Sequence, residues 1–259
     1  MEVIFQCLVL TIASGVILSE GRTWVDQRRF ALRTLRDFGF GKQGMEEMIQ
    51  EEVELFKALI LQNGEESFDF INKLNLPILN ALWRVTVGER YDYENPKLLS
   101  IVNRLTEAFK RFAKPESVLV IAFPWICKIN PKAFERDKTL SVNQDIMNLM
   151  TESIKQHQDT LDVNDPRDFT DKMLIEINNT TDKSSSFYGE VGIDNLRNTL
   201  FDLFLAGSET TSTTLTWAAL YMVRYPDVQK KVQDELDKVV GQNRHPSIKD
   251  KPNLPYTEV

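Results

Sequence analysis

The segment at residues 200–223 (LFDLFLAGSETTSTTLTWAALYMV) most constrains the fold, because it is too apolar for an exposed helix and too polar for a membrane span. Glu209 lies near its middle, and a central acid costs about 2.5–3.5 kcal/mol in a bilayer. Asp202 and five threonines add to that cost. The segment therefore predicts a long helix, residues 192–224, that is buried inside a helical domain and ends before Pro226.

The remaining sequence also has the apolar spacing of helices, with glycine or proline at the boundaries. We expect Pro77 to bend the helix in which it lies. No alternating strand pattern is long enough to suggest a sheet core, so the predicted fold class is mainly α. The predicted helices are residues 24–37, 45–61, 69–87, 96–113, 132–160, 166–177, 192–224 and 226–241, with an irregular stretch at 115–131 and a loop at 245–255.

The acidic balance of the chain argues against broad nucleic-acid binding. There are 31 Lys plus Arg against 38 Asp plus Glu, giving a net charge of −7, whereas nucleic-acid binding uses a positive face. Cys7 and Cys127 are the only cysteines, so neither a disulfide framework nor a zinc site is expected. His157 and His245 lie far apart in the sequence, so we predict two surface histidines and no His-based catalytic or metal cluster.

A second apolar segment, residues 3–18 (VIFQCLVLTIASGVIL), is shorter than the roughly 20 residues needed to cross a bilayer. Only Glu2 separates it from the initial Met, so the basic residues that begin a signal peptide are missing. We favour a buried beginning of the domain, with a signal-like or anchoring role as the alternative.

The long predicted helix contains two adjacent small residues, Ala206 and Gly207, which leave a groove where a flat ligand could approach the backbone. Glu209 and Thr210 follow, so two proton-carrying side chains would lie beside that groove; Thr211 is a weaker candidate. Thr210 can also bond back to a carbonyl one turn earlier and loosen the helix. The alternative is a helix that packs closely on a neighbour through the small pair, with Glu209 at the surface.

Trp24 and Arg28 are spaced i, i+4, which places both on one face of the first predicted helix. An indole N–H and a guanidinium are both donors and suit a carboxylate. The alternative is an exposed cation–π pair on a basic helix.

Together these motifs resemble the cytochrome P450 family, in its microsomal drug- and lipid-oxidising branch. Trp24-x-x-x-Arg28 is similar to the family's helix C motif, and the run from Ala206 to Thr211 (AGSETT) is similar to its helix I motif. Four weaker matches keep the family order: residues 82–93 (end of helix E), 165–169 (start of helix H), 225–229 (helix J) and 254–258 (helix K). The resemblance implies a partial cytochrome P450 domain at residues 15–259, from the helix C region to the start of helix K, preceded by an apolar segment at residues 1–14 that does not match.

The resemblance implies haem b as the cofactor and insertion of one oxygen atom from O2 into an apolar xenobiotic, steroid or fatty acid. Trp24 and Arg28 would hold a haem propionate, and Glu209 and Thr210 would deliver protons. Thr210 would also lie against the haem together with Ala206 and Gly207. The implied partners are a lipophilic substrate, NADPH-dependent P450 reductase and cytochrome b5, at the cytosolic face of the endoplasmic reticulum membrane. The implied substrate-pocket residues are Phe109, Phe112, Phe201, Leu205 and Ala206.

One departure from the family concerns the iron ligand, a Cys thiolate in a loop rich in Phe, Gly and Arg near the family's C-terminus. Neither Cys7 nor Cys127 has such surroundings, and the family's Glu-x-x-Arg of helix K would fall past Val259. We therefore expect the haem-thiolate loop to be missing and no turnover from residues 1–259 alone. The alternative function is a non-catalytic helical binding protein or an inactive truncated paralogue.

Overall fold

The computed structural model describes residues 14–62, 72–112 and 136–258, together with a few single residues between these ranges. Every regular element in that part of the chain is helical, so the mainly α fold class is confirmed. The helices are α2 (Gly21–Asp37), α3 (Gln43–Gln62), α4 (Asn75–Val87), α5 (Pro96–Phe112), α8 (Arg136–Thr160), α9 (Phe169–Asn179), α10 (Gly189–Arg224), α11 (Pro226–Val239), the 3-10 helix η1 (Ile248–Asn253) and α12 (Pro255–Glu258).

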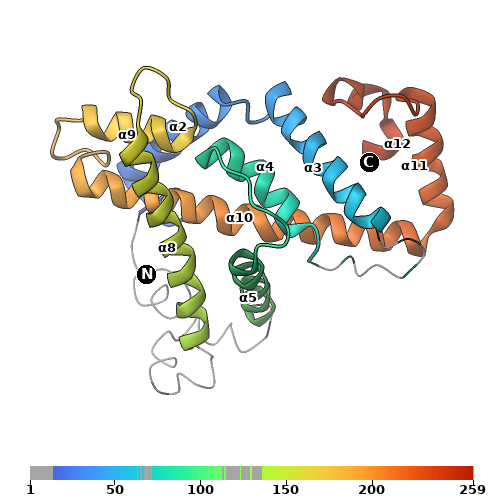
Figure 1. Cartoon of the computed structure of the whole chain (residues 1–259), viewed down its shortest axis with the longest axis horizontal. Helices are drawn as coiled ribbons and strands as arrows, with labels where there is room; N and C mark the ends of the chain where they lie inside the picture. The colour runs from blue at the N-terminus through green and yellow to red at the C-terminus, as the bar shows by residue number, and fades with distance from the viewer. Residues whose placement is uncertain are drawn as a thin grey trace.

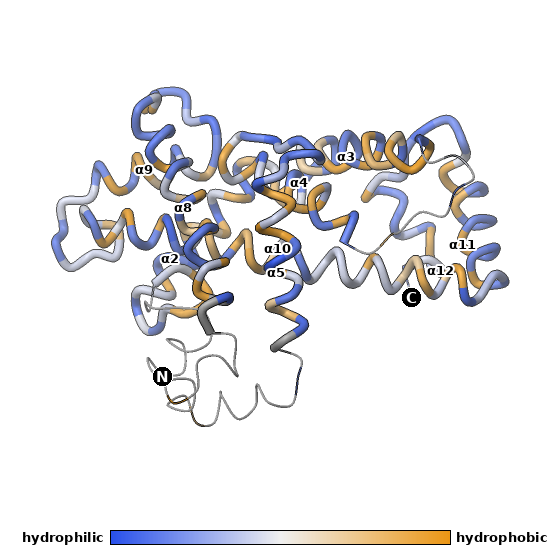
Figure 2. The backbone as a smooth tube through the Cα atoms, turned by 60° about the horizontal axis from the view of Figure 1, so that its bottom comes forward, coloured by the Kyte–Doolittle hydropathy of each residue, from blue (hydrophilic) through white to orange (hydrophobic). Residues whose placement is uncertain are grey.

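Helix α10 runs along the long axis of the molecule, and α4, α8 and α9 pack against it (Figure 1). It begins at Gly189 rather than at Gly192, and it ends at Arg224, as predicted, because Tyr225 precedes a proline. Hydrophobic and hydrophilic residues alternate along the helices (Figure 2), which is typical of helices with one buried face. The longest apolar segment of the sequence is therefore the central helix of the fold.

Aromatic side chains join the helices around α10. Trp83 of α4 is fully buried and meets Phe204 of α10 edge to face, with ring centroids 5.6 Å apart. Phe169 of α9 meets Phe30 of α2 in the same way at 6.1 Å. Burying a large apolar side chain stabilises the fold by about 1.5–3 kcal/mol, so these contacts fix α2, α4 and α9 around α10.

The beginning of α4 differs from the prediction, and the reason is Pro77. The helix begins at Asn75, so Pro77 lies in its first turn. Backbone N–H groups in a first turn have no intrahelical partner, and a proline costs little there. The predicted bend at Pro77 was therefore wrong, because this proline lies at the start of the helix and not in its interior.

Three further sequence predictions concern weakly patterned segments. The predicted loop near the end of the chain contains η1, which Ser247 and Asp250 begin with a reciprocal capping box. Most of the irregular stretch at 115–131 and of the apolar segment at 3–18 lies outside the described residues. Among the helices that the structure describes, none combines the length and apolarity needed to cross a membrane.

Candidate functional site

The two adjacent small residues of α10, Ala206 and Gly207, lie in different surroundings. A Cβ placed on Gly207 would lie 2.5 Å from Cδ2 of Leu82 in α4, so the glycine permits close approach of the two helices. Ala206 is exposed instead. The close-packing alternative therefore describes Gly207, whereas Ala206 leaves part of the helix surface open.

Thr210 lies one turn after Ala206 on the same face of α10 and is exposed. Its hydroxyl donates to the Ala206 carbonyl at 2.7 Å, and the Thr214 hydroxyl donates to the Thr210 carbonyl at 2.9 Å. The predicted back-bond of Thr210 is thus present, and α10 remains a continuous helix through it.

Glu209 is half-buried and turns toward α4 and α5. Its Oε2 accepts a hydrogen bond from Oγ1 of Thr106 at 2.8 Å and another from Nδ2 of Asn75 at 3.1 Å. The Asn75 amide also donates to the Thr106 hydroxyl at 3.3 Å. Both partners are almost fully buried. Sequence reasoning missed Asn75 and Thr106, because they join Glu209 only through the packing of three helices.

An apolar groove with a volume of about 480 Å³ lies between α3, α4 and α10, three helices that neighbour one another in Figure 1. Helix α10 contributes Ala206, Gly207 and Thr211 to its wall. Ligand sites commonly enclose about 300–1,000 Å³ of mostly apolar space, so this groove has the size and polarity of one. The other lining residues are Phe40, Met45, Ile49, Glu52, Val53, Phe56, Leu74, Pro77, Ile78, Ala81, Leu82, Leu203 and Leu215.

Of the predicted pocket residues, only Ala206 lines this groove. Phe201 is fully buried in the core, and Phe109 and Leu205 are half-buried against it. The side chain of Phe112 lies outside the described residues. The assignment of these phenylalanines to a substrate pocket stays a prediction.

Trp24 and Arg28 lie together on the exposed side of α2. The guanidinium carbon of Arg28 is 5.5 Å from the centroid of the Trp24 ring, and 38% of Trp24 is exposed. The pair therefore has the cation–π geometry that the sequence left open as an alternative. Within the described residues Arg28 has no acidic partner, so its donors remain available to a carboxylate.

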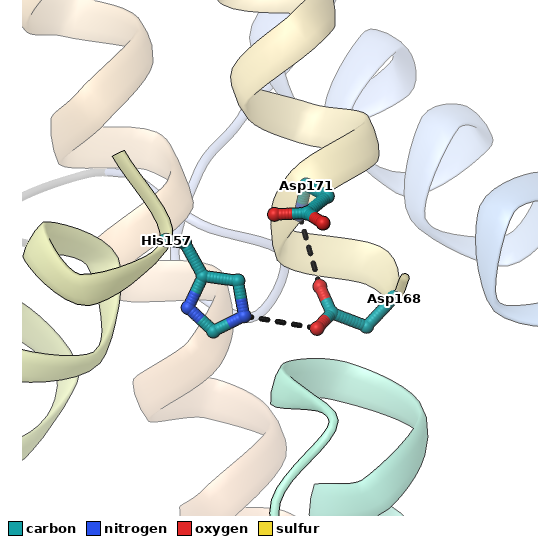
Figure 3. A group of neighbouring side chains, drawn as sticks. All are labelled: His157, Asp168 and Asp171. Carbon is teal, nitrogen blue, oxygen red and sulfur yellow. Dashed lines mark hydrogen bonds and ion pairs between the residues drawn. The ribbon is translucent and has the colours of Figure 1, made fainter. Parts of the chain in front are cut away.

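His157 was predicted to be a surface histidine, and this was wrong, because only 4% of it is exposed. Figure 3 shows its ring pointing from the end of α8 toward Asp168, which precedes α9, with Asp171 beside them. Potential metal-ligand atoms of the three residues lie within 4.8 Å of one another. Arg167 donates to both carboxylate oxygens of Asp171, at 2.7 and 2.8 Å, so a cation there would have to displace a guanidinium. The cluster is a hydrogen-bonded joint between α8 and α9.

Asp202, which the sequence marked only as an acid in an apolar helix, holds the chain segment before α2 against α10. Its Oδ2 accepts hydrogen bonds from the backbone N–H groups of Val16 and Ile17 at 2.8 and 2.9 Å. Burial raises the pKa of Asp202 to about 6, against the opposing effect of the two backbone donors. Beside it, Oδ1 of Asn195 accepts from the N–H of Gly15 at 3.1 Å.

Comparison with known proteins gives a consistent assignment. Residues 2–259 match the model of the family described as Cytochrome P450. The match begins ahead of the predicted boundary between residues 14 and 15, and that division of the chain stays a prediction.

Individual relatives agree with the family match. Cytochrome P450 2J5 of Mus musculus is 39% identical over 252 residues, which cover 96% of this chain and 48% of the relative. Cytochrome P450 2C1 of Oryctolagus cuniculus is 39% identical over 246 residues, covering 94% and 49%. Cytochrome P450 2J2 of Homo sapiens is 38% identical over 245 residues, covering 94% and 48%. The chain thus spans about half the length of these curated relatives. The family's cofactor is haem, as the motifs implied, and the chain belongs to the cytochrome P450 family.

Proposed function

We propose that the protein is a haem-thiolate monooxygenase that oxidises an apolar organic substrate of the xenobiotic, steroid or fatty-acid class. The reaction balances as R–H + O2 + 2 e⁻ + 2 H⁺ → R–OH + H2O, with the electrons supplied by a redox partner. Family membership supports the proposal. The observation that carries it is the held carboxylate of Glu209, which directly precedes the exposed hydroxyl residue Thr210 on α10.

The exposed residues of α10 and α2 have the chemistry that one side of a haem site would need. Ala206 and Thr210 are exposed one turn apart, so the helix surface between them is open to a flat ring. Arg28, which has no acidic partner in the described residues, and the Trp24 N–H beside it are suited to a propionate. When bound, haem would supply the chemistry that activates O2.

The chain's own residues would supply protons. The Glu209 carboxyl acts as a general acid and base, since a carboxyl group held in a fixed position can take a proton from solvent and pass it on. The Thr210 hydroxyl donates its one hydrogen to the Ala206 carbonyl. It therefore passes a proton to the space above Ala206 only when that bond is released, and it must then take up a replacement proton. General acid–base groups of this kind contribute about 10²–10⁴-fold to a reaction rate.

Residues 1–259 by themselves are proposed to be inactive. The sequence offers only Cys7 and Cys127 as thiolates, and neither has neighbouring glycines of the kind that the family's axial loop contains. A haem bound to these residues alone would lack its normal ligand, so turnover requires a thiolate that this sequence does not supply.

Partners and location follow from the family alone. We propose a lipophilic substrate, electron transfer from NADPH-dependent P450 reductase with cytochrome b5 as a second donor, and residence at the cytosolic face of the endoplasmic reticulum membrane. Relatives in the 2J and 2C groups support this placement.

The apolar groove favours a second candidate function, that of a non-catalytic helical protein which binds a lipophilic ligand. Its wall is almost entirely hydrocarbon, and Glu52 is the one acidic residue among the described residues that line it. An inactive truncated paralogue that retained only this groove would bind such ligands without oxidising them.

The test supplies the missing thiolate by joining residues 1–259 to the haem-thiolate segment of a relative such as cytochrome P450 2J2. The haem-loaded protein is then compared with two variants, Thr210→Ala and its matched control Thr214→Ala. Both threonines are exposed on α10, and both hydroxyls donate to the carbonyl four residues earlier. The monooxygenase proposal expects haem absorbance, NADPH-dependent product formation, and a loss of about tenfold or more in Thr210→Ala only. Ligand binding without any oxygen consumption would support the non-catalytic alternative instead.

A further inference from the structure

Glu209 presents its two carboxylate oxygens to different surroundings. Oε2 faces the helix interface, where the Thr106 hydroxyl and the Asn75 amide donate to it at 2.8 and 3.1 Å. Oε1 faces the Thr213 hydroxyl at 3.4 Å. Thr213 is exposed and lies on the same side of α10 as Ala206 and Thr210, because residues i, i+4 and i+7 share one helix face. Glu209 therefore extends from the buried interface to the edge of the open face.

The two donors decide which oxygen can carry a proton. Oε2 already accepts two hydrogen bonds, so protonating it would break one of them. The buried donor that lost its acceptor would then be unsatisfied, which costs free energy. Among the described residues, Oε1 has only the longer contact with Thr213. The proton on a neutral Glu209 therefore resides on Oε1, at the side from which it can reach the open face.

Helix α5 also supplies a charge. Lys110 follows Thr106 by one turn on α5, and Glu209 adds to the rise in the pKa of Lys110, although the neighbouring Glu107 has the larger effect. The carboxylate thus has a hydroxyl donor and an ammonium group on the same helix.

We propose that Asn75 and Thr106 are positioning residues for proton delivery: by holding Oε2 of Glu209, they direct Oε1 toward the face formed by Ala206, Thr210 and Thr213. The inference rests on the proposed monooxygenase function. It adds two residues, one from α4 and one from α5, that lie outside the family-like motif of α10. Neither residue reaches the open face, since both are almost fully buried.

The experiment uses the same haem-loaded protein as the test of function, in which a thiolate-bearing segment of a relative is joined to residues 1–259, together with its reductase. It compares Thr106→Val with Thr106→Ser. Valine keeps the volume and removes the donor, whereas serine restores the hydroxyl. The measured quantity is how the two electrons divide between R–OH plus H2O and the side reaction O2 + 2 e⁻ + 2 H⁺ → H2O2. We expect Thr106→Val to lower coupled product formation by about tenfold and to change the solvent isotope effect, because a positioned proton donor contributes about 100-fold or more. Thr106→Ser should restore both.

Thr170→Val is the matched control. Its hydroxyl is equally buried and donates to the Thr86 carbonyl at 2.8 Å, away from Glu209. This variant should lose stability as Thr106→Val does, yet keep the wild-type division of electrons. If Thr170→Val diverts electrons to H2O2 as strongly as Thr106→Val, the effect is general loosening and the positioning role is overturned.

A second measurement needs no turnover. Thermal unfolding of Thr106→Val, Glu209→Met and the double variant forms a double-mutant cycle that measures the contact between the two side chains, because methionine removes the oxygen acceptor. The double variant should lose less than the sum of the single losses in Tm; additive losses overturn the contact. Wild-type protein that binds haem yet consumes no oxygen overturns the proposed function. Wild-type turnover with an unchanged division of electrons in Thr106→Val overturns only the positioning role.

Discussion

His157 and Asp168 form a buried pair in which Nε2 of the imidazole lies 2.9 Å from Oδ2 of the carboxylate (Figure 3). The other ring nitrogen, Nδ1, lies 2.7 Å from the carbonyl oxygen of Ser153. A carbonyl and a carboxylate both accept hydrogen bonds, so these two neighbours favour the charged form of His157, in which both ring nitrogens carry a proton. Burial opposes this charge, but the bonds to Asp168 and Ser153 outweigh it, so the pKa of His157 lies above its usual range.

The raised pKa of His157 gives the first prediction. A histidine whose pKa is higher in the folded state contributes stability that is complete below its unfolded pKa of about 6.5 and is lost as pH rises through the folded value. Wild-type Tm should therefore fall relative to that of His157→Gln as pH increases above about 6.5. Differential scanning calorimetry across this range checks it, and parallel pH curves for the two proteins would contradict the ion pair.

Asp202 predicts a second pH effect in a different window. Burial raises its pKa from 3.8 to about 6, so the folded state holds this proton more tightly than the unfolded chain. Stability from this group is complete below about 4 and declines as pH rises to about 6. Asp202→Asn should remove that decline while keeping an oxygen acceptor for Val16 or Ile17. Urea unfolding at several pH values measures it; an unchanged slope between pH 4 and 6 would count against the assignment.

Two helical glycines should respond to alanine with opposite signs. A Cβ on Gly192 of α10 would lie 2.5 Å from the carbonyl oxygen of Phe187 and 2.8 Å from the side chain of Ile177. Such overpacking typically costs about 1–3 kcal/mol. Gly44 of α3 has only Gly39 near, at 3.9 Å, so Gly44→Ala should gain up to about 1 kcal/mol from helix propensity. The free energies of unfolding in denaturant check this. If Gly192→Ala and Gly44→Ala change them equally, Gly192 is not packed as closely as described.

Arg28 gives a prediction that separates haem binding from folding. Its side chain is exposed and contacts Trp24, so Arg28→Ala should leave the Tm of the haem-free protein nearly unchanged. The affinity of Arg28→Ala for haem should be about tenfold lower than that of the wild type, because a charge-assisted hydrogen bond contributes about 1.5–3 kcal/mol. Arg28→Lys should recover only part of it, since an ammonium lacks the planar fork of a guanidinium. Haem transfer to an acceptor protein measures this, and equal retention in all three would refute the propionate role.

The sequence by itself determined the helical class, the identity of α10 and the residues of its motif. Apolar spacing and the Pro and Gly boundaries are local properties, so they predict helices whatever lies around them. The cost of an acid in an apolar segment likewise pointed to Glu209 and Asp202 before any partner was known.

Only the tertiary structure decided what those acids contact. Glu209 is followed along the helix by Thr210 but is held by Asn75 and Thr106, residues 134 and 103 positions away in the chain. His157 looked like a surface histidine because its partner Asp168 lies beyond the turn between α8 and α9. Side-chain partners across a helix interface follow from the packing of aromatic and aliphatic faces, and helical periodicity tells which face is buried but not which polar groups will meet there.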